Sequence, residues 1–590
     1  MNRKIVSLIL AVLLSTGIFF VLVPQSGRAS STPTTLTVGI ISPGAITNLN
    51  PWEAGGQSAV TTDQLRGLYY LTLLLQAPNG TLMPQLAQSW SANANGSVYT
   101  FNLRPNLKWS DGTPLTASDV VYSFRLLQQH PLFDTLNGFI IAPLLQNVTA
   151  LNTTSVQFTL KHPFSPFLDY ASLGKYIVPE HIFSKIANIT AYTGSSSPVG
   201  DGPYMLVNWT AGATVLHYKA NPYFYMGKPK IANLAVELLS PTANIPALLQ
   251  TGEITLAQPA PSQVAALSGV SHVGISLSPG ISIVGSYFDP AGLFMFDDAL
   301  YPYNITSVRQ AIAYAINRSQ IVQLALNGYG TPGNQGQLPP SLSQWIPATL
   351  PNYTFNPAKA RSMLLGLGFK NGSNGYLTFP NGTAWTPKIM DVGGTASSIV
   401  SIIVQNLHAA GIDASESVVT IGTIVNALEY GTFDMLLLGT SRPPIPDFVL
   451  GVFVTNSVTP VGKQELDYHG WARWSNQTVW NDLNQARNVS AFSQQYALYS
   501  NAQQIMAEQV PLIVLYYGQN IWAYSNATIG GWGPAAQGYQ FPQAPLLMSL
   551  HGPATVSQPN NTYVYYAAAG VIAVLAVIGV AVYVVRKRQR

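Results

Sequence analysis

The sequence predicts a mixed α/β fold with more than one folded unit, and three observations support this. Continuous apolar runs at 434–440 and 511–517 are typical of strands buried on both faces. The segment 399–412 has the apolar spacing of an amphipathic helix, which Gly411 ends. The chain has 590 residues, 47% of them hydrophobic, so it can bury large cores and exceeds the usual size of one domain.

The N-terminal half adds a strand, a turn and a helix. The run 36–40 reads as a strand, and apolar residues alternate with polar ones over 99–103. Residues 111–114, Asp-Gly-Thr-Pro, form a turn, because Gly supplies a positive φ and Pro fixes the next one. Thr116 is a natural N-cap, and Asp119 lies at the positive end of the helix dipole. A helix with one apolar face is therefore expected after Thr116.

The composition excludes several classes of protein. Charged residues make up only 8% of the chain, against about 25% in typical domains. The formal net charge of +4 comes from scattered Lys and Arg, which is not the basic footprint of a nucleic-acid-binding protein. The chain has no cysteine, so disulfides, zinc-thiolate sites, thiol nucleophiles and lipid attachment to an N-terminal Cys are all excluded.

Both ends of the chain carry apolar segments that predict export and anchoring. Residues 1–29 have a basic start, an apolar stretch and a small-residue exit, as a signal segment does, although the stretch is long enough for an uncleaved anchor. A short linker, 30–35, follows. Near the other end, a stalk at 552–562 precedes an uncharged apolar run at 563–585, long enough to cross about 30 Å of hydrocarbon as a helix.

The tail 586–590 is basic, which predicts a single-pass anchor with the tail in the cytoplasm and the bulk of the chain outside. The alternative is that 563–585 is a buried core helix. Many Asn-x-Ser/Thr sequons agree with an external, glycosylated surface, although chance in an Asn- and Thr-rich chain explains several of them.

The sequence contains no constellation that predicts an enzyme. It has no G-x-S-x-G, P-loop, H-E-x-x-H or dinucleotide-binding motif, and its eight histidines have no metal-ligand spacing. Asp297 and Asp298 are adjacent carboxylates, which we interpret as a solvated turn. No catalytic residue, metal or cofactor is therefore expected.

Six blocks in order resemble the family 5 solute-binding proteins of ABC importers, the class that includes dipeptide, oligopeptide and nickel binders. Two of them depart from the family pattern, with Asp201 where Thr is usual and Leu367 where Ala is usual. The blocks read LMPQLAQSW (82–90), YTFNLRPNLKWSDGTPLTASDVVYSF (99–124), PVGDGPYML (198–206), VRQAIAYAINRSQI (308–321), FNPAKARSMLLGLGF (355–369) and QQIMAEQVPLIVLYY (503–517).

This resemblance implies a periplasmic-binding-protein-like fold of two lobes joined by a hinge, with ligand between them. The first lobe would take 36–276, with an inserted subdomain at 77–179, and the second lobe 277–515. A return segment at 516–551 would complete the first lobe. Sequons, low charge, missing cysteine and the C-terminal anchor together resemble the archaeal, surface-anchored type.

The resemblance also bears on the ligand. In peptide-binding relatives, an aspartate after the "F-D-M" strand pairs with the peptide amine. Here Arg442 or Pro443 stands at that position, and Asp447 matches a later, structural aspartate. The amine anchor is thus missing, and Arg442 would prefer an anionic or hydroxyl-rich ligand because buried charges need partners. The alternative is an ordinary surface-loop arginine.

Aromatic and amide side chains complete the candidate site. Their faces and polar edges suit sugar rings or apolar ligand surface, although core packing is the competing role for each, and for Trp474 as well. The candidate ligand-binding residues are Trp52, Phe133, Asn137, Ser441, Arg442, Asp447 and Trp471.

The function predicted from sequence is non-enzymatic capture of an oligosaccharide or oligopeptide for delivery to ABC permease subunits. A nickel chelate is a third ligand class. The alternative function is a surface sensor or adhesin on the same fold without transport. The expected partners are the ligand, the permease and, through the C-terminal helix, the membrane, with no nucleic acid.

Overall fold

A computed structural model describes most of the chain between Thr34 and Gly552. The described ranges are 34–42, 45–51, 65–77, 80–130, 133, 141–172, 175–195, 198–207, 209–240, 243–279, 291–440, 445–451, 454–465, 470–533 and 543–552. The predicted signal segment and the predicted membrane helix at 563–585 lie outside these ranges. Within them, no helix combines the length and hydropathy that a membrane crossing requires.

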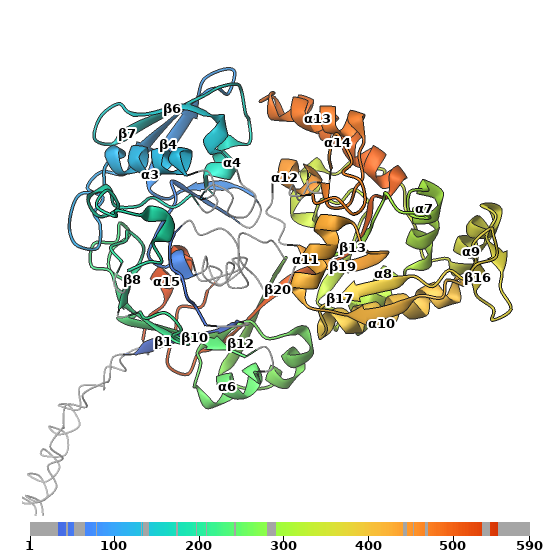
Figure 1. Cartoon of the computed structure of the whole chain (residues 1–590). Coiled ribbons are helices and arrows are strands. Elements are labelled where there is room, and N and C mark those ends of the chain that lie inside the picture. The colour runs from blue at the N-terminus through green and yellow to red at the C-terminus, as the bar shows by residue number, and fades with distance from the viewer. Residues whose placement is uncertain are drawn as a thin grey trace, which may run out of the picture.

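The chain folds into two lobes, the first at left and the second at right in Figure 1. In the first, β1 pairs in parallel with β10 and with β11, while β9 and β8 extend the ladder beyond β10. The strands of this sheet are β1 Thr35–Ile41, β8 Tyr204–Val207, β9 Val215–Ala220, β10 Asn233–Leu239, β11 Leu256–Ala257 and β12 Val273–Pro279. The predicted strand at 36–40 is confirmed as β1.

The inserted subdomain carries its own antiparallel sheet, in the order β4-β5-β7-β6, covered by helix α3 (Figure 1). Its elements are β2 Leu74–Gln76, β3 Leu82–Pro84, β4 Ala87–Ala92, β5 Val98–Leu103, α3 Ala117–Gln129, η2 Ala142–Leu144, β6 Leu145–Ala150, β7 Ser155–Leu160, α4 Phe167–Ser172 and α5 Glu180–Phe183. The expected cap of α3 is confirmed, because the Thr116 N–H donates to Asp119 Oδ2 at 2.8 Å.

The second lobe is built around β13, which pairs antiparallel with β19, while β19, β17 and β18 run parallel. The elements of this lobe are β13 Ala291–Phe296, α7 Thr306–Ala315, α8 Arg318–Leu324, β14 Gly330–Pro332, η5 Pro340–Trp345, α9 Pro357–Gly366, β15 Lys370–Asn371, β16 Leu377–Thr378, β17 Lys388–Asp391, α10 Thr395–Ala409, β18 Ser415–Val418, α11 Ile421–Tyr430, β19 Met435–Thr440, α12 Pro446–Gly451, α13 Gln477–Arg487 and α14 Phe492–Gln509. The predicted helix at 399–412 and strand at 434–440 are confirmed as α10 and β19.

Strand β20, Leu512–Ser525, joins the two lobes. Residues 512–517 pair with β13 in the second lobe, and residues 519–525 pair with β12 in the first. The sequence expected a strand over 511–517 only, because the apolar run stops there, yet backbone pairing continues for eight more residues. The change of partner lies next to the expected boundary between 515 and 516.

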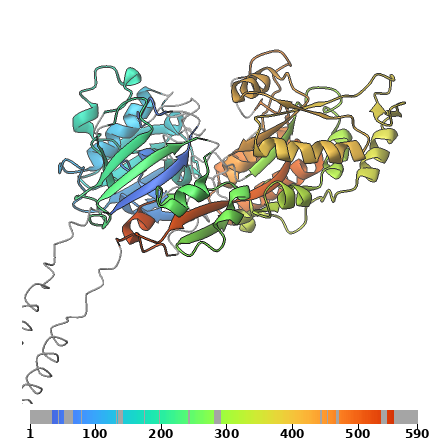
Figure 2. The same cartoon turned by 90° about the horizontal axis from the view of Figure 1, so that it is seen from below.

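Smaller elements complete the first lobe. These are η3 Ile189–Ala191, α6 Ile245–Thr251, η4 Pro261–Leu267 and α15 Ala544–Ser549. Seen from below in Figure 2, the first and last described residues lie on the same lobe, and a Cβ on Gly552 would stand 3.3 Å from Thr34 Oγ1. Both ends of the described chain therefore leave the fold at one place.

Alternation along the central strands builds separate cores on the two faces of the second sheet. Phe294 and Phe296 of β13 are buried in one core, while Leu293 and Met295 are buried in the other. The same period of two is expected of a strand buried on both faces. In the first lobe a single large core runs from β1 into the inserted subdomain.

One sequence interpretation was wrong. Asp297 and Asp298 do not form a solvated turn, since they are only 0% and 7% exposed. Asp298 Oδ1 lies 3.5 Å from Arg309 Nε, and the charge of Arg473 acts on Asp297. Burial raises the pKa of Asp297 to about 6, and Arg473 partly opposes that shift. Adjacent carboxylates looked solvent-directed because their cationic neighbours come from other segments, Arg309 from α7 and Arg473 from a position far along the chain.

Candidate functional site

The structure places only part of the predicted ligand set. Trp52, Asn137, Ser441 and Arg442 lie outside the described residues, so their ligand roles stay predictions. Phe133 is 7% exposed in the first-lobe core, with its ring 5.4 Å from that of His130.

Two predicted tryptophans pack on the core of the second lobe. Trp474 is buried within it, and Trp471 is half-buried against it. These surroundings favour core packing, which was the competing role considered for each aromatic residue. Contact of Trp471 with ligand remains a prediction.

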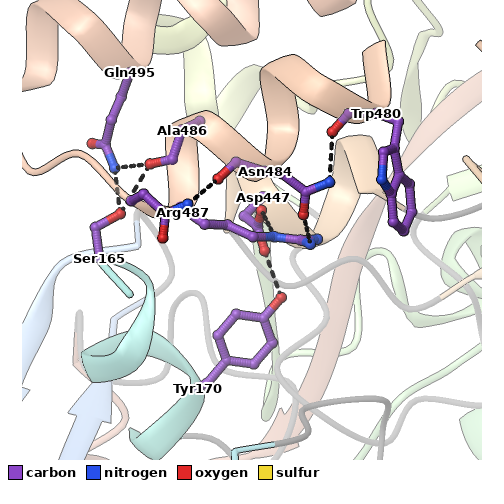
Figure 3. A network of polar contacts seen from close by, with 9 residues as sticks. Ser165, Tyr170, Asp447, Trp480, Asn484, Ala486, Arg487 and Gln495 are labelled. Carbon is purple, nitrogen blue, oxygen red and sulfur yellow. Dashed lines mark hydrogen bonds and ion pairs between the residues drawn. The ribbon is translucent and has the colours of Figure 1, made fainter. Parts of the chain in front are cut away.

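Asp447 lies at the centre of a polar network between the lobes, shown in Figure 3. Its carboxylate is 1% exposed on α12 of the second lobe. Arg487 Nε, from α13, donates to Oδ1 at 2.7 Å, and the Tyr170 hydroxyl, from α4 of the inserted subdomain, donates to Oδ2 at 2.8 Å. Both carboxylate oxygens are thus engaged within the protein, which agrees with the structural aspartate that the sequence resemblance suggested.

A second group of hydrogen bonds joins the same two parts of the chain (Figure 3). The Ser165 N–H donates to the Arg487 carbonyl at 2.7 Å, and its hydroxyl donates to the Ala486 carbonyl at 3.1 Å. Gln495 Nε2, on α14, donates to Ser165 Oγ at 2.7 Å. Backbone carbonyls at the end of α13 are therefore capped by a residue of the other lobe, as helix ends require.

Burial and charge shape the acid–base properties of this network. The charge of the Asp447 carboxylate raises the pKa of the Arg487 guanidinium, and burial of the guanidinium partly opposes that shift. Beside it, burial raises the pKa of Asp169 to about 7, the charge of Asp447 adds to that shift, and a 3.1 Å hydrogen bond from Gln76 Nε2 opposes it. Asp169 therefore changes charge near neutral pH at the place where the lobes meet.

The close approach of two loops positions the first-lobe side of the site. The Asp201 and Gly202 N–H groups both donate to the Tyr69 carbonyl, at 2.9 and 3.1 Å. A Cβ on Gly200 would stand 1.9 Å from that carbonyl oxygen, so only glycine fits there. The unusual Asp201 accepts from the Leu71 N–H at 2.9 Å, and burial raises its pKa well above the ordinary range.

Sequence reasoning missed Tyr170, Arg487, Ser165 and Gln495. The Tyr170–Asp447 bond joins positions 277 apart in the chain, so no local pattern announces it. The low content of charged residues was the one signal that could have pointed to Arg487. Because only 8% of the chain is charged, an arginine in an amphipathic helix is unusual here. Across the described ranges, no group of three or more His, Asp or Glu side chains is arranged to hold a metal ion.

The two-lobed fold has counterparts among known proteins. The family model described as "Bacterial extracellular solute-binding proteins, family 5 Middle" matches residues 81–459. The chain belongs to this family. Its members are described as solute-binding proteins.

Relatives of this family 5 protein match along most of their length. Di/tripeptide-binding protein 2 of Pseudomonas aeruginosa is 27% identical over 482 residues, covering 78% of this chain and 85% of the relative. The glutathione-binding protein GsiB of Escherichia coli is 27% identical over 511 residues, covering 85% and 92%.

Solved structures share the fold. NikZ of Campylobacter jejuni, in complex with Ni(L-His), has a TM-score of 0.70 at 24% identity, covering 84% of this chain and 95% of that one. A periplasmic oligopeptide-binding protein of Thermotoga maritima, bound to mannohexaose, has a TM-score of 0.71 at 21% identity, covering 89% and 99%. The oligopeptide-binding protein AppA of Bacillus subtilis, in complex with a nonapeptide, has a TM-score of 0.69 at 19% identity, covering 88% and 99%.

Proposed function

We propose that this family 5 protein is the extracellular solute-binding subunit of an ABC importer, which captures an oligosaccharide or oligopeptide between its lobes and delivers it to permease subunits. The observation that carries the proposal is the Tyr170–Asp447–Arg487 network, because its Tyr170–Asp447 bond joins the inserted subdomain to the second lobe, in addition to strand β20. A solute held between the lobes would be enclosed when these contacts form.

The mechanism is a shift between open and closed states. A solute that contacts both lobes binds the closed state better and populates it in proportion to that difference in affinity. The network supplies part of the free energy that favours the closed state before any solute binds. The solute therefore has to supply only the rest of that free energy. The closed form would then be the one that docks on the permease.

The contacts that Asp447 makes within the protein favour one class of ligand over another. Relatives and structural neighbours are named for dipeptides, tripeptides and glutathione, or hold a nonapeptide, mannohexaose or a nickel chelate. A peptide ammonium enclosed without a carboxylate loses hydration at a cost of several kcal/mol. Asp447 already balances Arg487, so it is a poor amine anchor. We therefore propose that an oligosaccharide binds more readily than a free-amine peptide.

Calorimetry on the purified protein tests this choice with three probes: mannohexaose, a nonapeptide, and the same nonapeptide acetylated at its N-terminus. Acetylation is the matched control, because it removes only the ammonium. We expect mannohexaose to give measurable heat and the acetylated peptide to bind at least as well as the free one. Tight binding of the free-amine peptide alone, lost in Asp447→Asn, would identify Asp447 as the anchor and refute the proposal.

Delivery and location are tested in cells. Deleting the gene should abolish uptake of the bound solute, whereas unchanged uptake with lost surface attachment would favour the adhesin alternative. We further propose that 563–585 anchors the protein to the cell membrane with the folded region outside, as in the archaeal, surface-anchored type. Removal of 563–590 should then release the protein into the medium, and retention on the cells would refute that anchor.

A further inference from the structure

Strands β12 and β20 present opposite faces to different parts of the molecule. Side chains alternate along a strand, so Ile275 of β12 and Ala523 of β20 share a face, and both pack with α6 in one small core. Ser278 and Asn520 lie three residues along each strand from this pair, an odd number, so they point the other way. In Figure 1, α6 lies below β12 and β20, so this second face is on the side of the two strands away from α6.

Ser278 and Asn520 are direct partners in the antiparallel register of β12 and β20. Opposite side chains of such a pair lie about 5 Å apart at Cβ, so the two form one polar patch. Trp522, two residues further along β20 on the same face, is buried in the first-lobe core. The patch therefore lies between the first-lobe core at Trp522 and the point where β20 changes its partner from β12 to β13.

Both side chains of the patch are buried, and each has a polar atom without a hydrogen-bond partner in the part of the chain that the structure describes. Asn520 is 4% exposed and Ser278 is 7% exposed. Among the described residues, neither Asn520 Nδ2 nor Ser278 Oγ has a hydrogen-bond partner. Buried polar groups are normally paired, because each unpaired group weakens the fold, and exceptions call for an explanation such as a bound molecule.

The chemistry of the patch is neutral. Neither β12, with the sequence VGISLSP, nor β20, with LIVLYYGQNIWAYS, contains Asp, Glu, Lys or Arg. An ammonium or carboxylate placed here would find no opposite charge on either strand, whereas an uncharged oxygen would meet an amide donor and a hydroxyl.

We propose that Asn520 and Ser278 form a neutral hydrogen-bonding subsite at the hinge, which takes an uncharged acceptor oxygen of the bound solute. A peptide carbonyl and a sugar hydroxyl both offer that chemistry. The inference rests on the proposed function, because it assigns a place in the molecule to part of the captured solute. It also explains why polar residues are kept where apolar ones would give a more stable hinge.

The first test needs no solute. Asn520→Leu replaces the amide by an apolar group of similar size, and thermal unfolding compares it with the parent and with Gln519→Leu, an exposed neighbour on the opposite face. If the amide is unsatisfied, the Tm of Asn520→Leu should equal or exceed that of the parent. A lower Tm in Asn520→Leu but not in Gln519→Leu would show that the amide already has a structural partner, and would overturn the proposal.

The second test measures binding of mannohexaose and of the acetylated nonapeptide to the parent, Asn520→Leu, Ser278→Ala and Gln519→Leu. Loss of one hydrogen bond in an enclosed site should weaken binding about tenfold in the first two variants and leave Gln519→Leu unchanged. The probe that loses affinity identifies which acceptor the subsite takes. Equal affinities in all four proteins would overturn the subsite. If the parent binds neither probe, the proposed solute class fails, while a raised Tm in Asn520→Leu still supports an unfilled polar site.

Discussion

In addition to the hydrogen bonds of Ser165, the hydroxyl group of Tyr170 should favour closure of the two lobes. Its hydrogen bond to Asp447 Oδ2, 2.8 Å long, runs between the inserted subdomain and the second lobe. The Arg487–Asp447 pair lies within the second lobe and would survive opening. Tyr170→Phe therefore removes an interaction that belongs to the closed state alone and leaves the packing of the ring in place.

The size of the effect follows from the charge of the acceptor. Hydrogen bonds to charged groups contribute about 1.5–3 kcal/mol, and Asp447 is 1% exposed, so water does not readily replace the lost donor. Each 1.4 kcal/mol is a factor of ten, so the closed population should fall relative to the open one by roughly 10- to 150-fold. Affinity for a solute that needs the closed state should fall by up to the same factor.

The matched control is Tyr99→Phe. Tyr99 is also a buried tyrosine of the inserted subdomain, but its hydroxyl donates to the Phe164 carbonyl at 3.0 Å, within the same subdomain. Losing that bond should lower the stability of the subdomain without opening the lobes. Comparing Tyr170→Phe with Tyr99→Phe therefore separates an effect on lobe closure from an effect on subdomain stability.

The assay is a single-molecule distance measurement between the lobes, made without solute and with mannohexaose. Because the chain has no native cysteine, dyes can be attached at Leu151→Cys on the subdomain and Leu365→Cys on α9, both at exposed positions. Tyr170→Phe should shift the population toward the longer distance. An unchanged distribution, or an equal shift in Tyr99→Phe, would refute the role of the network in closure.

Three further predictions concern stability. The raised pKa of Asp169, about 7, means that the folded chain holds a proton that the unfolded chain has released, so this contribution is full below about pH 4 and is lost as pH rises through 7. Asp169→Asn should therefore flatten the fall in Tm between pH 4 and 8, and parallel curves would contradict this. Asp447→Asn leaves Arg487 without its counter-charge and should destabilise the fold by about 3–5 kcal/mol in denaturant unfolding, whereas a loss below about 1 kcal/mol would argue against a buried ion pair. Gly200→Ala should sharply lower the Tm because its Cβ has no room, while Gly366→Ala, in α9 with nothing within 4 Å, should raise it slightly; equal effects would be inconsistent with the close approach at Gly200.

Local structure was predictable from sequence where it depends only on interactions between residues that are close in the chain. The cap at Thr116 and Asp119, the apolar face of α3 and the buried strand β19 depend on side chains within one turn or one strand. The extent of β20 was not predictable beyond 517, because residues 518–520 interrupt the apolar run and pairing with β12 carries the strand through them. Asp297 and Asp298 were misread for the same reason, since Arg473 and Arg309 come from other segments.

By itself, the sequence determined the α/β class, the family and the absence of cysteine chemistry, since these depend on residue order and composition. Only the tertiary structure revealed the partners of Asp447, because an isolated aspartate serves equally well as an amine anchor or as half of an ion pair, and its ligand role stays a prediction. Arg487 and Tyr170 occupy both of its oxygens, and Tyr170 comes from the other lobe. The unsatisfied pair at Asn520 and Ser278 likewise arises from strand register, which brings distant residues face to face. Contacts between distant segments are set by the summed packing of whole lobes, and no local pattern encodes them.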